Sequence, residues 1–416
     1  MKNLTKTRWY ILIATLVVNI CIGTAFAWSV FQAGLSKESN SIFGHSVTKQ
    51  QLALAFTICS GVSPICMILG PTLQKKLGSP RIVIWAGGLL FGLGLILSGF
   101  ISKLWMLYLT YGIVCGFGSA LAYGITISNT VRLFPDKKGL ASGLVTAAFG
   151  AGAIIFPPVI NAIINTDGTM QAFKVLGILF IVLVLIAGFF IKEAPVGFVP
   201  DNFEQKVAIN KKEIPSKNWQ GMLKDIRFYI MISIFTIFAT AGLMLISQGS
   251  QISQAVGHIT AEKAAMIVSI IAVGNTLGRL IFGFISDKIG ANKTLLIMTS
   301  LVTVCSFVLY FVINNEILVA FIILAVIVAM CYGGSMGVYP SLTPQTFGLK
   351  YNGVNYGIMF IGFALGSYFG PVIANSLFET SASYALSLLV VAFLGLVGFI
   401  LVNVFIKVNK KLTKEA

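Results

Sequence analysis

The sequence predicts an all-α membrane protein whose twelve transmembrane helices form two pseudo-symmetric six-helix bundles. Of its 416 residues, 57% are hydrophobic and 10% are charged, whereas soluble proteins carry about 25% charged residues. The apolar residues lie in continuous runs of about twenty, the length that a helix needs to cross about 30 Å of hydrocarbon. Continuous runs favour helices over a barrel, because barrel strands alternate apolar and polar residues.

Twelve apolar runs are long enough to span the membrane. They cover residues 9–32, 52–69, 82–101, 104–131, 140–163, 172–191, 228–248, 260–283, 294–313, 316–340, 352–376 and 382–406. The first run contains Ala25-Phe26-Ala27, which resembles a signal-peptidase site. We expect no cleavage there, because the run is longer than the apolar core of a signal peptide, about 7 to 15 residues.

The distribution of Lys and Arg orients these helices. With both chain ends on one side, the segments on that side hold 23 of the 29 Lys and Arg residues, and the opposite ends and loops hold five. Basic residues accumulate on the cytoplasmic side of membrane proteins. We therefore expect a multi-pass protein of the cell inner membrane with both termini in the cytoplasm. The net charge of +16 is interpreted as an orientation signal, and no nucleic-acid partner is expected.

The two halves of the chain resemble each other. A polar stretch at 192–227, expected to be a cytoplasmic linker, separates a bundle at 1–191 from a bundle at 228–416 with a short basic tail. Four short motifs recur in the same order: Arg8-Trp9-Tyr10-Ile11 as Arg227-Phe228-Tyr229-Ile230, Lys75-Lys76-Leu77-Gly78 as Asp287-Lys288-Ile289-Gly290, Tyr123-Gly124 as Tyr332-Gly333, and Phe156–Ile160 as Phe369–Ile373. This repetition indicates duplication, and duplicated halves of transporters typically rock about a site near the membrane midplane.

The residue types that catalysis or metal binding require are missing from the spans. All six cysteines lie in apolar runs without CxxC or Cys/His spacing, so neither disulfides nor a metal site are expected. The interiors of the runs contain no Asp, Glu or His. The sequence therefore predicts a protein that is not an enzyme and needs no cofactor, and no phosphate-binding loop suggests ATP as its energy source.

Arg279 is the one basic residue in the interior of an apolar run. It precedes Asp287 by eight residues, which places it about 12 Å along a helix from the cytoplasmic end. A guanidinium at that depth is costly unless it faces a partner or a wet cavity. Because no acidic partner is available in the spans, we expect a small carboxylate ligand, which a planar guanidinium binds bidentately. The alternative is a structural Arg279 bonded to backbone carbonyls.

Several segments resemble a known family. Gly283-Phe284-Ile285-Ser286-Asp287-Lys288-Ile289-Gly290 resembles the loop signature of the major facilitator superfamily. Within it, Arg132–Gly143, Tyr123-Gly124 and Asn355-Tyr356-Gly357 are similar to the oxalate/formate antiporter family. The resemblance extends from Arg8 to about residue 400 and implies the major facilitator fold. It also places Arg279 at the family's substrate-binding arginine, and it places the following residues at or beside cavity-lining aromatic positions: Tyr123, Tyr332, Phe26, Trp28 and Phe360.

One departure from the family pattern bears on the substrate. The oxalate carrier has a lysine in its eleventh span, and the matching residue here is Phe363. A single fixed cation suits a monoanion, because a buried dianion would keep about one uncompensated charge. Together with a resemblance to the branch of pyruvate-like carriers, this predicts pyruvate, lactate or formate as substrate. An oxalate/formate type of dicarboxylate antiporter is the alternative.

Asn275 lies one helical turn before Arg279 and bears on energy coupling. The related monocarboxylate/proton symporters have an aspartate at about this place, and an amide cannot titrate. The sequence therefore favours exchange or uniport over proton-coupled symport. A membrane sensor that binds an anion without transporting it is the alternative outside the carrier class.

The resemblance also predicts a gate at the cytoplasmic ends of the helices. Asp287 is expected to meet the N-terminus of the fifth helix near Gly139, where the helix dipole favours negative charge, with Lys288 and Arg132 beside it. In the first half of the chain, Lys75 stands at the position that corresponds to Asp287. The equivalent contact in that half must therefore be absent or built differently. Solvated surface charges are the alternative reading. We expect a monomer in the lipid bilayer.

Overall fold

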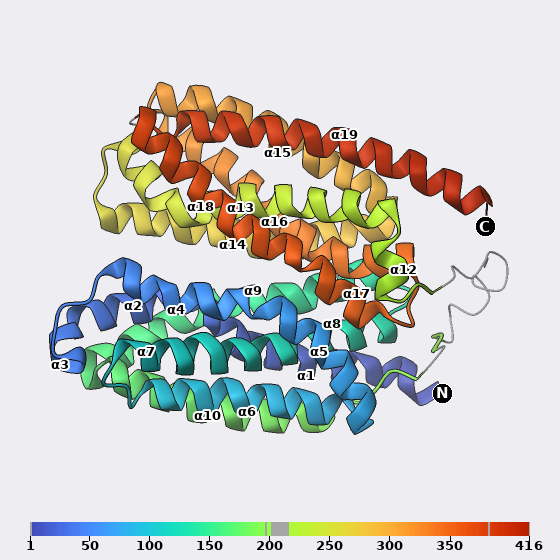
Figure 1. Ribbon diagram of the computed structural model, residues 1–416, viewed down its shortest axis with the longest axis horizontal. Coiled ribbons are helices and arrows are strands. Elements are labelled where there is room, and N and C mark those ends of the chain that lie inside the picture. Colours follow the sequence, from blue (N-terminus) through green and yellow to red (C-terminus); the bar gives the residue numbers. More distant parts are fainter. Residues whose placement is uncertain (1, 196–197, 201–215, 382, 416) are drawn as a thin grey trace. The chain divides into compact units, whose positions relative to one another are not determined.

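The computed structural model describes residues 2–195, 198–200, 216–381 and 383–415. Within these residues the regular elements are helices, and twelve of them are long and apolar enough to cross a membrane (Figure 1). Each of the twelve overlaps one of the apolar runs in the sequence, so the expected all-α, twelve-span fold class is confirmed. Much of the linker expected at 192–227 lies outside the described residues, and the domain boundaries placed around it stay a prediction.

The chain forms two compact units. Unit 1 comprises Met1–Asp136, Ala148–Glu213 and Asn352–Ile358, and unit 2 comprises Lys137–Ala147, Ile214–Tyr351 and Met359–Ala416. Two helices contribute to both units. The first residues of α9 (Lys138–Asp167) belong to unit 2 and its remainder to unit 1, and nearly all of α17 (Asn352–Met359) belongs to unit 1.

Unit 1 packs the helices of the first six spans around an apolar core. In this unit α6 and α10 lie side by side, and α8 packs against α5, α6 and α1 (Figure 1). Besides α9 and α17, its elements are α1 (Lys2–Gly23), η1 (Thr24–Ala27), α2 (Trp28–Lys37), α3 (Ser39–Phe43), α4 (Lys49–Gly61), α5 (Ser63–Leu77), α6 (Pro80–Ser98), α7 (Leu104–Leu107), η2 (Tyr108–Cys115), α8 (Gly116–Leu133) and α10 (Thr169–Phe190).

Unit 2 packs the helices of the second six spans in a similar way. Here α15 and α19 lie side by side, α14 packs against α16, and α13 contacts α16, α18 and α19 (Figure 1). Its elements besides the start of α9 are α12 (Trp219–Leu223), α13 (Ile226–Gly257), α14 (Ala261–Ile289), α15 (Ala291–Asn314), α16 (Leu318–Phe347), α18 (Ile361–Ser381) and α19 (Ala385–Glu415).

Several spans that the sequence shows as continuous are interrupted in the structure. The first contains a single 3₁₀ turn, η1, between α1 and α2, and the fourth contains a π-helical segment, η2. The second breaks at Val62, where Pro64 stands in the first turn of α5. A proline is tolerated in a first turn, because the N–H that it lacks would have no partner there.

Two arginines of the internal repeat occupy similar positions in the two units. In unit 1, Arg8 donates to both carboxylate oxygens of Asp136, at 2.6 and 2.9 Å, and lies 4.6 Å from the ring centroid of Phe134. In unit 2, Arg227 lies 5.7 Å from the ring centroid of Phe347. Phe134 and Phe347 each stand at the end of a corresponding helix, α8 and α16. The shared placement supports the duplication inferred from the sequence.

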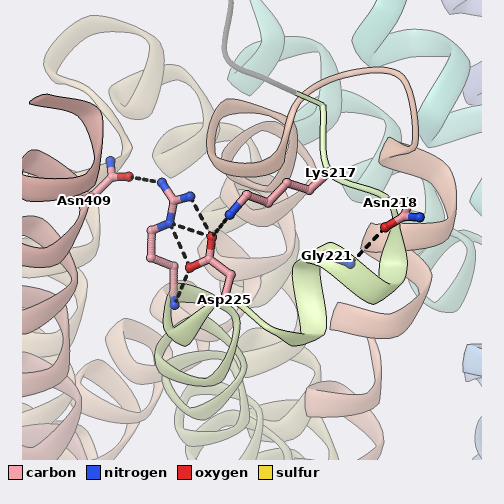
Figure 2. A network of polar contacts seen from close by, with 6 residues as sticks. Lys217, Asn218, Gly221, Asp225 and Asn409 are labelled. Atoms are coloured by element: carbon pink, nitrogen blue, oxygen red, sulfur yellow. Dashed lines mark hydrogen bonds and ion pairs between the residues drawn. The ribbon is translucent and has the colours of Figure 1, made fainter. Parts of the chain in front are cut away.

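The acid that binds Arg227 comes from the chain just before α13, as Figure 2 shows. Asp225 accepts hydrogen bonds from Nε and NH2 of Arg227, the shorter at 2.6 Å, and from Nζ of Lys217 at 2.7 Å. Asn409 of α19 accepts from NH1 of Arg227 at 2.8 Å. Lys217 also donates its backbone N–H to the carbonyl of Phe347, so this polar cluster joins the segment before α13 to α16 and α19.

The charge of Asp225 responds to these contacts. Burial raises its pKa, but the hydrogen bonds from Arg227 and Lys217 outweigh burial and hold the pKa at about 2. The pKa of an unfolded aspartate is about 3.9. The folded state therefore gains stability from the ionised carboxylate above about pH 4, and it loses that contribution as the pH falls through about 2.

Replacing Asp225 with asparagine is expected to lower the free energy of unfolding by about 3–5 kcal/mol at neutral pH, because buried Arg227 would lose its ionic partner. Unfolding by denaturant in detergent would measure this loss, with the exposed Glu379→Gln as control. The difference from wild type should be constant between pH 5 and 8 and shrink below about pH 4. Equal stability of the two proteins at pH 7 would contradict this role of Asp225.

Candidate functional site

Arg279 lies in the second half of α14 and is half-buried. Its Nε donates to Oδ1 of Asn275 at 3.1 Å, and its NH1 donates to the main-chain carbonyl of Thr146 at 2.5 Å. No carboxylate among the described residues forms an ion pair with it, and NH2 makes no hydrogen bond with them. The guanidinium is thus held at two of its three nitrogens by neutral acceptors, and its charge is not balanced by an acidic side chain in the described part of the chain.

The helices around Arg279 approach one another closely. A Cβ at Gly143 of α9 would lie 2.5 Å from the carbonyl oxygen of Arg279, and a Cβ at Gly337 of α16 would crowd the same oxygen. Asn275, 5% exposed, is packed in the same way, because Gly333 of α16 lies against its main-chain carbonyl. Small residues on α9 and α16 therefore fix the backbone of α14 at the height of the guanidinium.

The aromatic candidates of unit 2 form two groups. Tyr332 is buried in α16, and its ring fills the space in front of Gly242 of α13. Phe360 and Phe363 stack with ring centroids 4.8 Å apart, and Phe360 lies 6.2 Å from Phe235. Both Phe360 and Phe363 are buried, so residue 363 belongs to an apolar stack.

The aromatic candidates of unit 1 also form two groups. Phe26 and Tyr123 both contact Phe149, at centroid distances of 5.3 and 4.5 Å. Trp28 joins a different cluster, 4.3 Å from Tyr111, although it is only two residues from Phe26. Phe26 lies in the 3₁₀ turn η1, whereas Trp28 is the first residue of α2. The indole Nε1 of Trp28 is buried and has no hydrogen-bond partner among the described residues.

Asp287 binds the N-terminus of α9. Its Oδ1 accepts from the backbone N–H of Gly139 at 2.8 Å, and its Oδ2 accepts from that of Leu140 at 2.7 Å. The hydroxyl of Ser142 in the same turn donates to the main-chain carbonyl of Gly337 at 2.6 Å. The contact expected between Asp287 and the fifth span is confirmed, while its role as a gate stays a prediction. The carboxylate satisfies N–H groups that have no partner within the helix.

The two basic residues expected beside Asp287 lie in different surroundings. Lys288 is exposed, and its Nζ stands 4.4 Å from the ring centroid of Phe284 on the same helix. Arg132 is half-buried near the end of α8 and belongs to unit 1, where the carboxylate of Glu193 attracts it electrostatically. Neither side chain has a role that the structure assigns, so their part in gating stays a prediction.

Thr146 and Ser142 form contacts around Arg279 and Asp287 that were not predicted from the sequence. Thr146 contributes a main-chain carbonyl, a group that every residue carries, so no side-chain pattern points to it. Ser142 bonds across to α16 through a hydroxyl that the sequence shows only as a small polar residue beside Gly143. The spacing of Gly139 and Gly143 was the available signal, because two small residues four apart allow a close helix contact.

The sequence of this chain is similar to those of several known membrane transporters. A family model for the Major Facilitator Superfamily matches residues 9–360 and 255–416. The uncharacterized transporter YhjX of Escherichia coli K12 is 29% identical over 366 residues, covering 88% of this chain and 87% of that protein. The oxalate:formate antiporter of Oxalobacter formigenes is 28% identical over 402 residues, covering 96% and 91%. Human monocarboxylate transporter 12 is 25% identical over 398 residues, covering 88% and 74%.

Solved structures show the same fold at lower sequence identity. The proton:xylose symporter XylE matches with a TM-score of 0.72 and 16% identity, covering 95% of both chains. FucP, in its outward conformation, matches with a TM-score of 0.67 and 15% identity, covering 95% of this chain and 99% of that one. The twelve candidate membrane helices of the described residues, the matching family model and the fold of these two structures agree, and the chain belongs to the major facilitator superfamily of membrane transporters.

Proposed function

We propose that this transporter carries small monocarboxylates, such as pyruvate, lactate or formate, across the membrane by alternating access. The observation that carries the proposal is Arg279, a guanidinium inside a membrane helix whose described contacts are all neutral. An anion would supply the missing negative charge, and a carboxylate matches the planar fork of an arginine. Relatives named for oxalate, formate and monocarboxylate transport support this class of substrate.

Phe363 favours a monoanion over oxalate. The residue is 4% exposed and stacks on Phe360, so no fixed positive charge stands at this position. A dianion bound at Arg279 alone would keep about one buried charge without compensation, and such a charge costs several kcal/mol. A second candidate function, oxalate/formate exchange, rests on the similarity to the oxalate:formate antiporter.

Replacing Phe363 with lysine is expected to raise the preference for oxalate over pyruvate by about tenfold or more, equivalent to about 1.4 kcal/mol. The added ammonium would compensate the second charge of the dianion. Competition of both anions with labelled pyruvate in proteoliposomes measures the shift. Phe363→Met is the matched control, because it keeps an apolar side chain and should leave selectivity unchanged. A folded lysine variant with wild-type selectivity would argue against the one-charge explanation.

For coupling, we propose exchange or uniport. Asn275 bonds to Arg279 through a group that does not titrate, so this position offers no proton acceptor. Stimulation of uptake by internal anion, with no response to an imposed pH gradient, supports exchange, and the opposite result supports proton symport. Binding by the wild type without any flux would support the anion sensor instead.

The expected placement of the protein also remains a proposal. The bias of Lys and Arg toward one side supports an inner-membrane carrier with cytoplasmic termini. We propose that it works as a monomer, because each chain contains both duplicated halves. Labelling of cysteines added at the termini in sealed cells tests the orientation, and mass measurement in detergent tests the oligomeric state.

A further inference from the structure

The start of α9 is held on unit 2 by three polar contacts. Asp287 binds two backbone N–H groups of its first turn, Ser142 donates to the carbonyl of Gly337, and Arg279 donates to the carbonyl of Thr146. The contacts of Asp287 and Ser142 use no group that we assign to the substrate. The third uses the guanidinium that we assign to the substrate, and it therefore connects substrate binding to the attachment of α9.

A carboxylate that binds an arginine through two parallel N–H bonds needs two neighbouring nitrogens. One available edge of Arg279 consists of Nε and NH2, and the other consists of NH1 and NH2. Nε is already bonded to Asn275 and NH1 to Thr146. A bidentate anion on the Nε edge would displace Asn275, because Nε has a single N–H, whereas on the NH1 edge it would share NH1, which has two N–H groups, with the carbonyl of Thr146.

The costs of losing the two acceptors differ. The side-chain oxygen of Asn275 has its one described hydrogen bond with Arg279, and the residue is 5% exposed, so displacement would leave a buried acceptor unpaired. The carbonyl of Thr146 lies within α9, where the N–H of residue 150 is its regular helical partner. It remains satisfied without Arg279. The anion is thus directed to the edge formed by NH1 and NH2.

We propose that the substrate carboxylate and the carbonyl of Thr146 compete for Arg279, so that binding of the anion releases the start of α9 from α14. In this arrangement Asn275 is a positioning residue: by holding Nε, it presents the NH1 edge to the substrate. A charged carboxylate displaces a neutral carbonyl, because hydrogen bonds between two charged groups are stronger. This inference rests on the proposed function, since it takes Arg279 as the anion-binding group.

Hydrogen exchange of the backbone amides in residues 137–147 tests the competition. The purified full-length protein would be measured in lipid nanodiscs with and without pyruvate. In the wild type, saturating pyruvate is expected to speed exchange in this segment by about tenfold, because local opening controls the rate. Residues 160–167, at the other end of α9, provide the internal control and should not change.

Two variants sharpen the test. Arg279→Gln lacks the charged donor, so exchange in 137–147 should already be fast without pyruvate and should not respond to it. Asn275→Ala frees Nε, so pyruvate can bind the other edge; binding should persist while the effect on α9 disappears. A merely structural Asn275 would change the basal rate and leave the pyruvate response in place, and that result would overturn its positioning role.

Pyruvate binding, measured separately by calorimetry, distinguishes the two proposals. If pyruvate binds but exchange in 137–147 stays the same or slows, the competition is wrong and the proposed function stands. If pyruvate, lactate and formate all fail to bind, the proposed function is wrong. The ligand-free comparison of wild type with Arg279→Gln still decides whether the guanidinium holds α9, and equal exchange rates would overturn that contact's role.

Discussion

Replacing Arg279 with alanine is expected to reduce carboxylate uptake in proteoliposomes by about a hundredfold or more. Truncating one partner of a buried charged pair costs about 2–5 kcal/mol, and the guanidinium of Arg279 is the charged group that we assign to the anion. Binding and transport should fall together, because the same group would hold the anion in every step. Initial uptake rates and calorimetric binding of pyruvate measure the two losses.

Two further variants control for the charge and for the fold. Arg279→Lys keeps the positive charge but loses the planar fork, so it should retain a small part of the activity. Arg81→Gln removes an arginine that packs between Trp85 and Phe189 in unit 1, and uptake should continue. A folded Arg279→Ala protein that transports at the wild-type rate would refute the assignment of the anion site.

Replacing Asp287 with asparagine is expected to release the start of α9. The carboxylate accepts two backbone N–H bonds at the helix N-terminus, and hydrogen bonds to a charged group contribute about 1.5–3 kcal/mol. An amide keeps one acceptor oxygen and no charge, so the attached state should lose about tenfold or more in population. The alkylation rate of Val145→Cys, a buried position in this segment, should rise by the same factor.

Asp167→Asn provides the matched control for this experiment. Asp167 is the exposed last residue of α9, where it contacts Thr166, so its loss should not affect the start of the helix. The six native cysteines of the chain are buried, which limits background alkylation. Unchanged labelling of Val145→Cys in the Asp287→Asn background would show that the carboxylate is not what holds α9.

The Arg279→Ala and Asp287→Asn variants remove contacts at opposite ends of the same segment, the start of α9. Asp287 binds the first turn of α9, and Arg279 binds Thr146 two turns further along. The Asp287 contact uses no group that we assign to the anion, whereas we propose that an anion competes for the Arg279 contact. If both results hold, the attachment of α9 depends on a structural acid and on the occupancy of the substrate site.

The apolar runs alone located the twelve candidate membrane helices of the described residues, because lipid imposes a length and a composition that can be counted along the chain. The ends of the helices were predicted less accurately. The helix expected to end at residue 248 continues to Gly257, and the one expected to end at 340 continues through Pro340 and Pro344 to Phe347. Polar residues at these ends are compatible with both helix and loop, so neighbouring helices decide where each one stops.

The sequence by itself also determined the isolated Arg279 and, through a family motif, the pairing of Asp287 with α9. Only the tertiary structure decided that Thr146 binds the guanidinium, that Trp28 turns away from Phe26, and that Asp225 holds Arg227. The physical reason is common to all three. Burial in lipid is recorded residue by residue in the composition, whereas a contact depends on the rotation of each helix and on backbone groups that are identical along the chain.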